Sequence, residues 1–233
     1  MLIASPRHSA NDVAAWEVHR RTDEINAYRW RGWFAREEAK SIAMIRAFVE
    51  AGPCYVGCSW GKDSTVVAHL VTLARVRPPI VWVRLDGVDN PDCPLVRDAF
   101  LAAHDVEYHE LRAPVGESRR LERGIEMARD RFGRRYVNGI RATESRVRRL
   151  SILRHGEDTG AACRPIAWWS SDRIYAYLHA RELPVHPAYG CSMGGRLARE
   201  WLRVSSIGGE RGTGHGRAEW ERRYYPLTGT GNP

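Results

Sequence analysis

Two patterns of apolar and polar positions alternate along the chain. Segments with the character of strands occur at 54–58, 80–85, 106–111 and 136–139, and the run at 80–85 is apolar at every position but Arg84, as in a strand buried on both faces. Apolar residues at helical spacing predict helices over about 10–51, from residue 65, and over 94–104, 121–132, 143–154 and 171–181. This alternation predicts an α/β fold: a three-layer parallel sheet with right-handed crossovers, preceded by N-terminal helices.

Three chemically distinctive segments each follow a predicted strand. The segment 59–65 follows the first, Asp86 follows the second, and Arg141 lies just after the fourth. In a parallel sheet the carboxyl ends of the strands meet at one edge, and ligands bind there. The sequence therefore predicts a single site at this edge.

The segment Ser59-Trp60-Gly61-Lys62-Asp63-Ser64-Thr65 joins a strand to a helix. A loop of small residues here points backbone N–H groups at an anion, and the helix N-terminus adds a favourable dipole, so we expect a phosphate site. A Walker A loop needs four residues between its glycines followed by Lys-Ser/Thr, whereas three residues separate Gly57 from Gly61 and Asp63 follows Lys62. A chance glycine turn is the simpler alternative, which the strand and helix on either side make the weaker one.

The loop resembles the Ser-x-Gly-x-Asp-Ser signature of the PP-loop ATP pyrophosphatases, in the branch similar to phosphoadenylylsulfate (PAPS) reductase. Residues 139–146 are similar to the Gly-x-Arg-x-x-Glu-Ser element of that branch, and the stretch from Arg164 to Pro187 resembles the one that follows it there. These ordered matches span about residues 52 to 190. The resemblance implies an adenine-nucleotide α-hydrolase-like sheet with the strand order 3-2-1-4-5.

The resemblance also implies a reaction. The loop would grip the β,γ-pyrophosphate of ATP while a substrate oxygen attacks the α-phosphorus, and the adenylylated substrate would then meet a nitrogen or sulfur nucleophile. Such transfer depends on positioning and on neutralising charge rather than on a protein nucleophile. The backbone and hydroxyl groups expected to cradle the phosphates are those of Ser59, Gly61, Ser64 and Thr65.

Three residues are expected to act in catalysis. Lys62 offers a point charge to a phosphate, and Arg141 offers a fork of donors to the α-phosphate or the leaving group. Asp63 either caps the helix, the commoner role of such a residue, or holds Mg²⁺.

Further residues of the expected nucleotide site have simpler alternatives. Glu144 is expected to fix an arginine, or it is a surface carboxylate, and Asp86 contacts ribose or adenine, or forms a turn before Gly87. Arg164 and His186 belong to the substrate-side segment of the resemblance, although a lone histidine is more often structural. Trp60 departs from the Gly or Ser usual at its place, and its indole would stack on a base or wall off the pocket.

The cysteines limit the chemistry. The chain has five, at 54, 58, 93, 163 and 191, with no Cys-x-x-Cys pair, so we expect reduced thiols and neither a structural zinc site nor an iron–sulfur cluster. The Glu-Cys-Gly-x-His element of PAPS reductases is missing, and no cysteine follows the similar Ser-Ile-Gly turn at 206–208. Cys191 is the thiol that could substitute, and an inert loop thiol is its simpler interpretation.

The net charge and the hydropathy of the chain limit the kinds of partner it is expected to bind. The chain has a net charge of +8, and 34 of its 36 basic residues are arginines, the lysines being Lys40 and Lys62. This favours nucleotides and is compatible with nucleic acid, but solvated helix faces explain the arginines equally well. No apolar run approaches the roughly 20 residues of a membrane span, and the first residues do not resemble a signal peptide, so we expect a cytoplasmic protein.

We therefore expect an N-terminal helical segment over 1–51, a nucleotide-binding domain over 52–190, and a Gly-rich tail over 191–233 that completes the site. The leading hypothesis is an adenylyltransferase that uses ATP and Mg²⁺, compatible with sulfur insertion into nucleic acid with the help of a sulfur-donor protein. One alternative is a sulfonucleotide-binding enzyme of the PAPS reductase type. The other is a non-catalytic module that binds nucleotides or nucleic acid.

Overall fold

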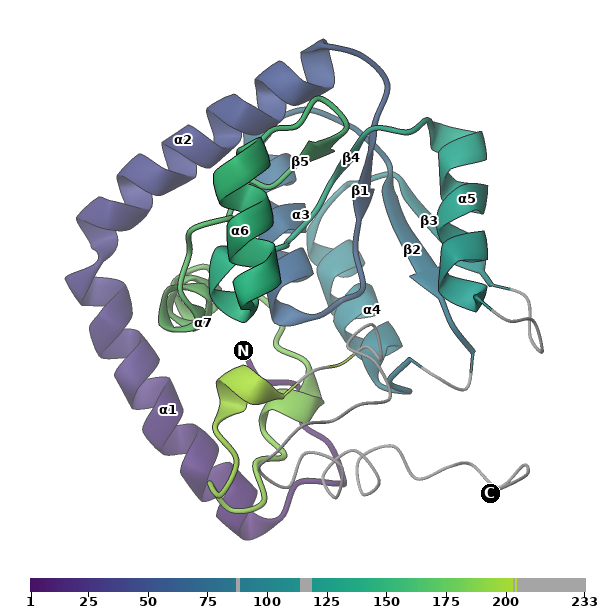
Figure 1. Cartoon of the computed structure of the whole chain (residues 1–233). Coiled ribbons are helices and arrows are strands. Elements are labelled where there is room, and N and C mark those ends of the chain that lie inside the picture. The colour runs from purple at the N-terminus through teal and green to yellow at the C-terminus, as the bar shows by residue number, and fades with distance from the viewer. Residues whose placement is uncertain (87–88, 114–118, 203, 205–233) are drawn as a thin grey trace.

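A parallel β-sheet forms the centre of the molecule (Figure 1). The computed structural model describes residues 1–86, 89–113, 119–202 and 204. The strands are β1 (Tyr55–Gly57), β2 (Ile80–Arg84), β3 (Tyr108–Arg112), β4 (Tyr136–Val137) and β5 (Ala162–Cys163). Their order is β3-β2-β1-β4-β5, with every neighbouring pair parallel. The predicted fold class and strand order are confirmed.

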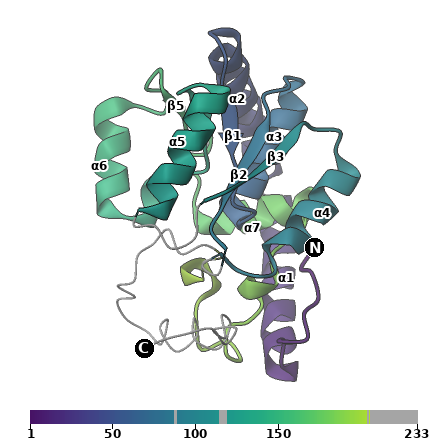
Figure 2. The ribbon, with the colours of Figure 1, turned by 90° about the vertical axis from the view of Figure 1, so that its right-hand side faces the viewer.

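Helices cover both faces of the sheet. They are α1 (Ala10–Arg29), α2 (Arg31–Glu50), α3 (Lys62–Ala74), α4 (Cys93–Ala103), α5 (Arg120–Phe132), α6 (Arg146–His155) and α7 (Ser171–Ala180). Figure 2 shows α3 and α4 on one side of the sheet and α5 and α6 on the other. The described residues also form the short 3₁₀ turns η1 (Ala142–Glu144), η2 (Pro187–Tyr189) and η3 (Arg199–Trp201).

The segment predicted to be helical over 10–51 forms two helices that meet at Trp30. Ser9 and Asp12 form a capping box that starts α1. Helix α1 packs along α7, and α2 packs against α3, so both N-terminal helices lie against the part of the chain that follows residue 51. The division of the chain into these three segments remains a prediction.

The main core lies between the sheet and the helices α2, α3 and α7. Helix α3 is buried on nearly all sides, and the largest enclosed side chains of this core include Phe48, Trp60, Trp82, Trp169 and Tyr177. Among the described residues, no helix is both long and apolar enough to cross a membrane. The predictions for the Gly-rich tail beyond residue 204 fall outside the described part of the chain.

Candidate functional site

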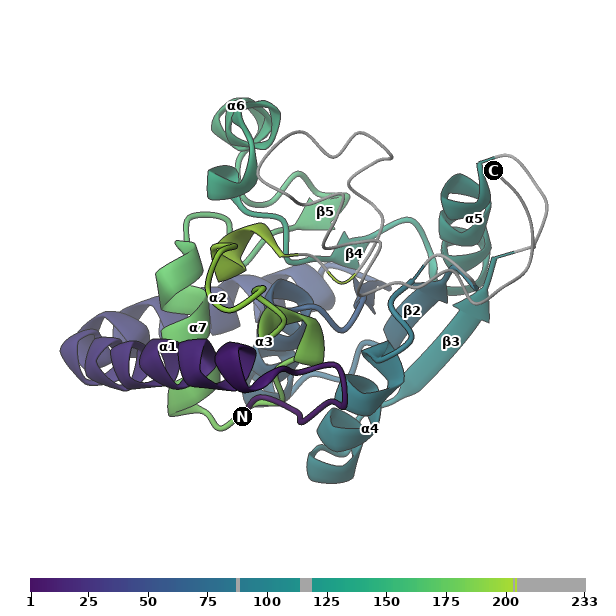
Figure 3. The same ribbon diagram turned by 90° about the horizontal axis from the view of Figure 1, so that it is seen from below.

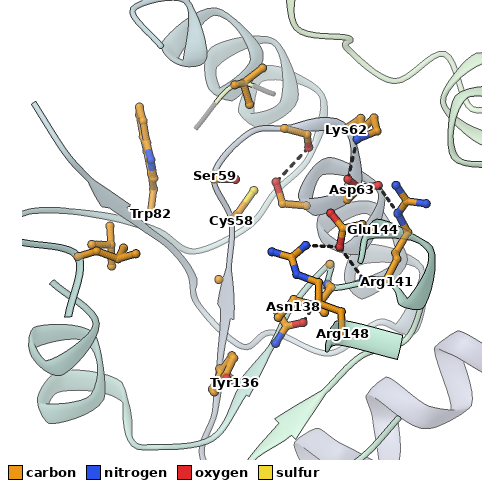
Figure 4. A pocket seen from close by; sticks show the side chains of 18 of the residues that line it. Cys58, Ser59, Lys62, Asp63, Trp82, Tyr136, Asn138, Arg141, Glu144 and Arg148 are labelled. Atoms are coloured by element: carbon orange, nitrogen blue, oxygen red, sulfur yellow. Dashed lines mark hydrogen bonds and ion pairs between the residues drawn. The ribbon is translucent and has the colours of Figure 1, made fainter. Parts of the chain in front are cut away.

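A pocket of about 770 Å³ opens where β1, β2 and β4 end. The loop that leads into α3 and the segment after β4 form one part of it, and α5, α6 and residues 200–202 form other walls (Figure 4). Figure 3 shows the ribbon from below, with α5 and α6 on the same side of the sheet. Seven of the predicted site residues line it: Ser59, Gly61, Lys62, Asp63, Ser64, Arg141 and Glu144. The segments predicted to meet after β1 and β4 therefore do meet.

The loop brings the N-terminus of α3 to this pocket. Gly61 is the N-cap residue, and the Ser64 hydroxyl donates a hydrogen bond to the Gly61 carbonyl oxygen over 3.0 Å. The Lys62 N–H donates to the Tyr189 hydroxyl over 3.1 Å. The first turn of α3 thus presents backbone N–H groups and the positive end of the helix dipole, an arrangement suited to an anion.

Three charged side chains form two ion pairs beside the loop (Figure 4). Asp63 Oδ2 lies 2.9 Å from the Lys62 ammonium, and Asp63 Oδ1 lies 2.8 Å from Arg141 Nε. The side chains of Lys62 and Arg141 are only 6% and 2% exposed. Burial by itself would raise the pKa of Asp63, but the charges of Lys62 and Arg141 outweigh it, so the pKa is lowered and the carboxylate stays ionised.

Arg141 is held on several sides. Besides its ion pair with Asp63, its Nη1 donates to the Thr143 hydroxyl and to the Trp169 carbonyl oxygen, each over 2.9 Å. Its Nη2 donates to the Ser171 hydroxyl over 3.2 Å. Three of its five N–H groups donate to protein atoms and its side chain is only 2% exposed, so the guanidinium has little capacity left to bind a phosphate bidentately.

The side chain of Glu144 pairs with the side chain of Arg148 and not with that of Arg141. Its carboxylate accepts the Arg141 backbone N–H over 2.9 Å and forms an ion pair with Arg148, one turn into α6. Arg148 and Arg129 both line the pocket and were not among the predicted site residues. The spacing of Glu144 and Arg148 is i,i+4, a signal that could have identified Arg148, whereas Arg129 follows no motif.

Trp60 is placed differently from the prediction. Its backbone has φ 60°, and its indole is fully buried in the core, with ring centroids 5.8 Å from Phe100 and 5.7 Å from Tyr108. The left-handed conformation turns the side chain into the protein. The indole therefore does not face the pocket and cannot stack on a base there.

Four other predicted residues do not line the pocket. Thr65 is fully buried within α3, and Asp86 forms ion pairs with Arg84 and Arg112. Arg164 donates to the Gly156 carbonyl oxygen, and His186 accepts the Ala188 N–H and caps η2. His186 is also buried, which lowers its pKa to about 3 and keeps the ring neutral. For His186 this cap is the structural role weighed above, whereas the ion pairs of Asp86 were not among the roles expected for it.

The carboxylate of Asp63 does not fit a resident Mg²⁺. Both of its oxygens are engaged by cationic side chains, and a cation at this position would face Lys62 and Arg141. Within the described ranges, no group of three or more His, Cys, Asp or Glu side chains could hold a metal ion.

Comparisons with known proteins concern the fold. No protein-family profile matches the chain, and no curated protein matches its sequence. A PAPS reductase from Candida auris, solved as a phosphate complex, is 14% identical over 63% of this chain and 82% of its own, with a TM-score of 0.49. The U34-tRNA thiolase NcsA from Methanococcus maripaludis, solved with its [4Fe-4S] cluster, is 14% identical over 75% of this chain and 69% of its own, with a TM-score of 0.42.

Proposed function

We propose that this protein is a PP-loop ATP pyrophosphatase that acts as an adenylyltransferase, cleaving ATP to AMP and pyrophosphate to activate a substrate oxygen. One observation carries the proposal. The loop 59–65 starts α3 at the pocket, with Asp63 held between Lys62 and Arg141. This arrangement offers a preorganised site for the leaving pyrophosphate, which is what the transfer needs.

The residues that line the pocket would have different roles in this reaction. The first turn of α3 and the Ser64 hydroxyl would bind the β- and γ-phosphates, and Lys62 would add charge. Arg141 would position Asp63 and the loop, because its own donors are directed at the protein. Arg129 and Arg148 would supply the positive charge at the α-phosphate that the sequence assigned to Arg141. Mg²⁺ would enter bound to ATP rather than reside at Asp63.

We further propose that the activated acceptor belongs to a nucleic acid and that a separate protein donates sulfur to it. The net charge of +8 favours a polyanionic acceptor. All five cysteines are buried, so a persulfide would have to come from another protein.

Sulfonucleotide reduction is the second candidate, since the same loop would hold the phosphates of PAPS. That reaction needs an accessible thiolate. Cys191 is 7% exposed, and burial raises its pKa to about 12, so it is a poor nucleophile at neutral pH. A protein that only binds nucleotides is the remaining alternative, and ATP binding without turnover in every mixture below would favour it.

The test measures AMP and pyrophosphate formed from α-labelled ATP with Mg²⁺, alone and with DNA or tRNA, beside a PAPS–thioredoxin reaction. The variant is Asp63→Asn, and the control is Asp98→Asn, which changes an acid that is 64% exposed on α4. We expect ATP cleavage that Asp63→Asn lowers about 100-fold, because it loosens the loop, while Asp98→Asn leaves it unchanged. Stimulation by one nucleic acid would name the acceptor. Sulfite from PAPS without ATP cleavage would refute the proposal.

A further inference from the structure

Tyr189, at the end of η2, lines the pocket and contacts Lys62 in two ways. Its hydroxyl accepts the Lys62 backbone N–H, the first of α3, over 3.1 Å. The Lys62 ammonium lies 5.4 Å from the centre of its ring, within the range of a cation–π contact. One aromatic side chain thus holds both ends of the lysine in the loop.

The fit between Tyr189 and the loop is close. A Cβ added to Gly61 would lie 3.2 Å from the Tyr189 hydroxyl oxygen, so only a glycine leaves room for this contact without a shift. The tyrosine is 3% exposed and stands edge-on to His186 and to Tyr175, with centroid distances of 6.3 and 5.9 Å. It cannot turn away from the loop without moving these rings.

Further contacts connect Tyr175, beside Tyr189, to helix α1. The Tyr175 hydroxyl donates to the Arg199 carbonyl oxygen over 3.0 Å, and the Arg199 guanidinium lies 3.8 Å from the centre of the Tyr175 ring. Arg199 forms a buried two-point ion pair with Asp23, in which Nη1 lies 2.6 Å from Oδ2. A continuous series of contacts therefore runs from the N-terminal helix to Lys62.

We propose that Tyr189 is a binding and positioning residue of the pyrophosphate site, an inference that rests on the function proposed above. A phenol hydroxyl accepts one hydrogen bond and donates another. On nucleotide binding, the Tyr189 hydroxyl keeps the Lys62 N–H as its donor and gives its own proton to a phosphate oxygen. The ring meanwhile holds the Lys62 ammonium at the pocket, beside Asp63.

The test measures the dissociation constants of inorganic pyrophosphate and of ATP by calorimetry with Mg²⁺, together with thermal unfolding. Tyr189→Phe removes the hydroxyl and keeps the ring, and Tyr189→Leu removes both. Tyr28→Phe is the matched control, because Tyr28 is 73% exposed on α1. We expect Tyr189→Phe to weaken pyrophosphate binding about 3- to 10-fold, Tyr189→Leu to weaken it further, and Tyr28→Phe to have no effect.

A double-mutant cycle with Lys62→Met separates positioning from general destabilisation. If the ring acts through the ammonium, Tyr189→Leu weakens pyrophosphate binding less in the Lys62→Met background than in the wild type, whereas Tyr189→Phe keeps the ring contribution. Additive effects of Tyr189→Leu and Lys62→Met would overturn the role of the ring.

The outcomes for the hydroxyl are also distinct. Unchanged pyrophosphate affinity in Tyr189→Phe would overturn the inference alone, provided that the wild type binds. Tighter binding would mean that the hydroxyl competes with phosphate for the Lys62 N–H, which also overturns it. If the wild type binds neither pyrophosphate nor ATP, the proposed function fails and this inference fails with it.

Discussion

Gly139 is the position at which one added methyl group tests how the site is assembled. It lies after β4, against the first turn of α3. A Cβ added to it would stand 2.9 Å from the Asp63 carbonyl carbon, 3.0 Å from the Asp63 carbonyl oxygen and 3.1 Å from the Ser64 nitrogen. All three are backbone atoms, so no side chain can rotate to relieve the contact. Gly139 does not have a positive φ, so the effect of alanine here would be steric alone.

The geometry sets the size of the effect. The nearest atom is about 0.5 Å closer than ordinary van der Waals contact, so the segment after β4 and the start of α3 must separate by about that distance. Overpacking of this kind typically costs about 1–3 kcal/mol, which for a chain of this length lowers Tm by roughly 2–12 °C. The same shift separates Asp63 from Arg141. Because a displacement of about 1 Å can cost about 100-fold in rate, we expect ATP cleavage to fall about tenfold.

The assay compares Gly139→Ala with wild type in thermal unfolding and in pyrophosphate release. Gly32→Ala is the control, because its Cβ would meet only the mobile end of Arg36, at 4.0 Å, on α2. Alanine in a helix is favoured over glycine, so this variant should be as active as the wild type and slightly more stable. If Gly139→Ala unfolds at the wild-type temperature and releases pyrophosphate at the wild-type rate, the two motifs do not depend on this close approach.

Two further predictions concern stability. Asp23→Asn leaves Arg199 buried without its counter-ion and should lower the free energy of unfolding, measured by urea titration, by about 3–5 kcal/mol. The double variant Asp23→Leu with Arg199→Met removes both charges and should be closer to wild type in stability. Equal losses of stability in the single and the double variant would contradict this. Burial lowers the pKa of His69 to about 4, against about 6.5 in the unfolded chain. Since the unfolded state binds the proton more readily between these values, the contribution of His69 is complete above pH 6.5 and is lost as the pH falls toward 4. The difference in unfolding free energy between wild type and His69→Gln should therefore shrink as the pH falls from 6.5 toward 4. A constant difference over that interval would show that His69 is not the source of this pH dependence.

Most of the fold could be predicted because its elements follow local rules. The run at 80–85, apolar at every position but Arg84, contains β2, and the predicted helices lie within about three residues of α4 to α7. Strand β5 was missed because Ala162 and Cys163 form only two ladder positions, too few to show a period. The helix predicted over 10–51 is divided at Trp30, where the Trp30 N–H turns back to the Asn26 carbonyl oxygen. Gly32 lies two residues after that break, and the sequence prediction gave this glycine no weight.

The candidate site could be predicted only in part, for a different reason. The motifs named residues by position in the chain, and the contacts that decide a side chain's role come from distant segments. Arg141 is tied to Trp169 and Ser171, and Tyr189 reaches Lys62 across 127 positions of sequence. The burial of Trp60 depends on a left-handed backbone that an L-residue seldom adopts, so the sequence pattern could not predict it.

The charge balance within the motif separates two ways in which the loop could work. Asp63 offsets one of the two cationic charges beside it, so the three side chains together carry a net charge of only +1. If the loop worked mainly by attraction, Asp63→Asn would make the pocket more positive and bind pyrophosphate more tightly. If it works by preorganisation, the same change frees Lys62 and Arg141 from their common partner, and both affinity and turnover fall. The burial of Lys62 and Arg141 and the number of bonds to Arg141 favour preorganisation. The sign of the change in pyrophosphate affinity on Asp63→Asn therefore tests the mechanism as well as the site.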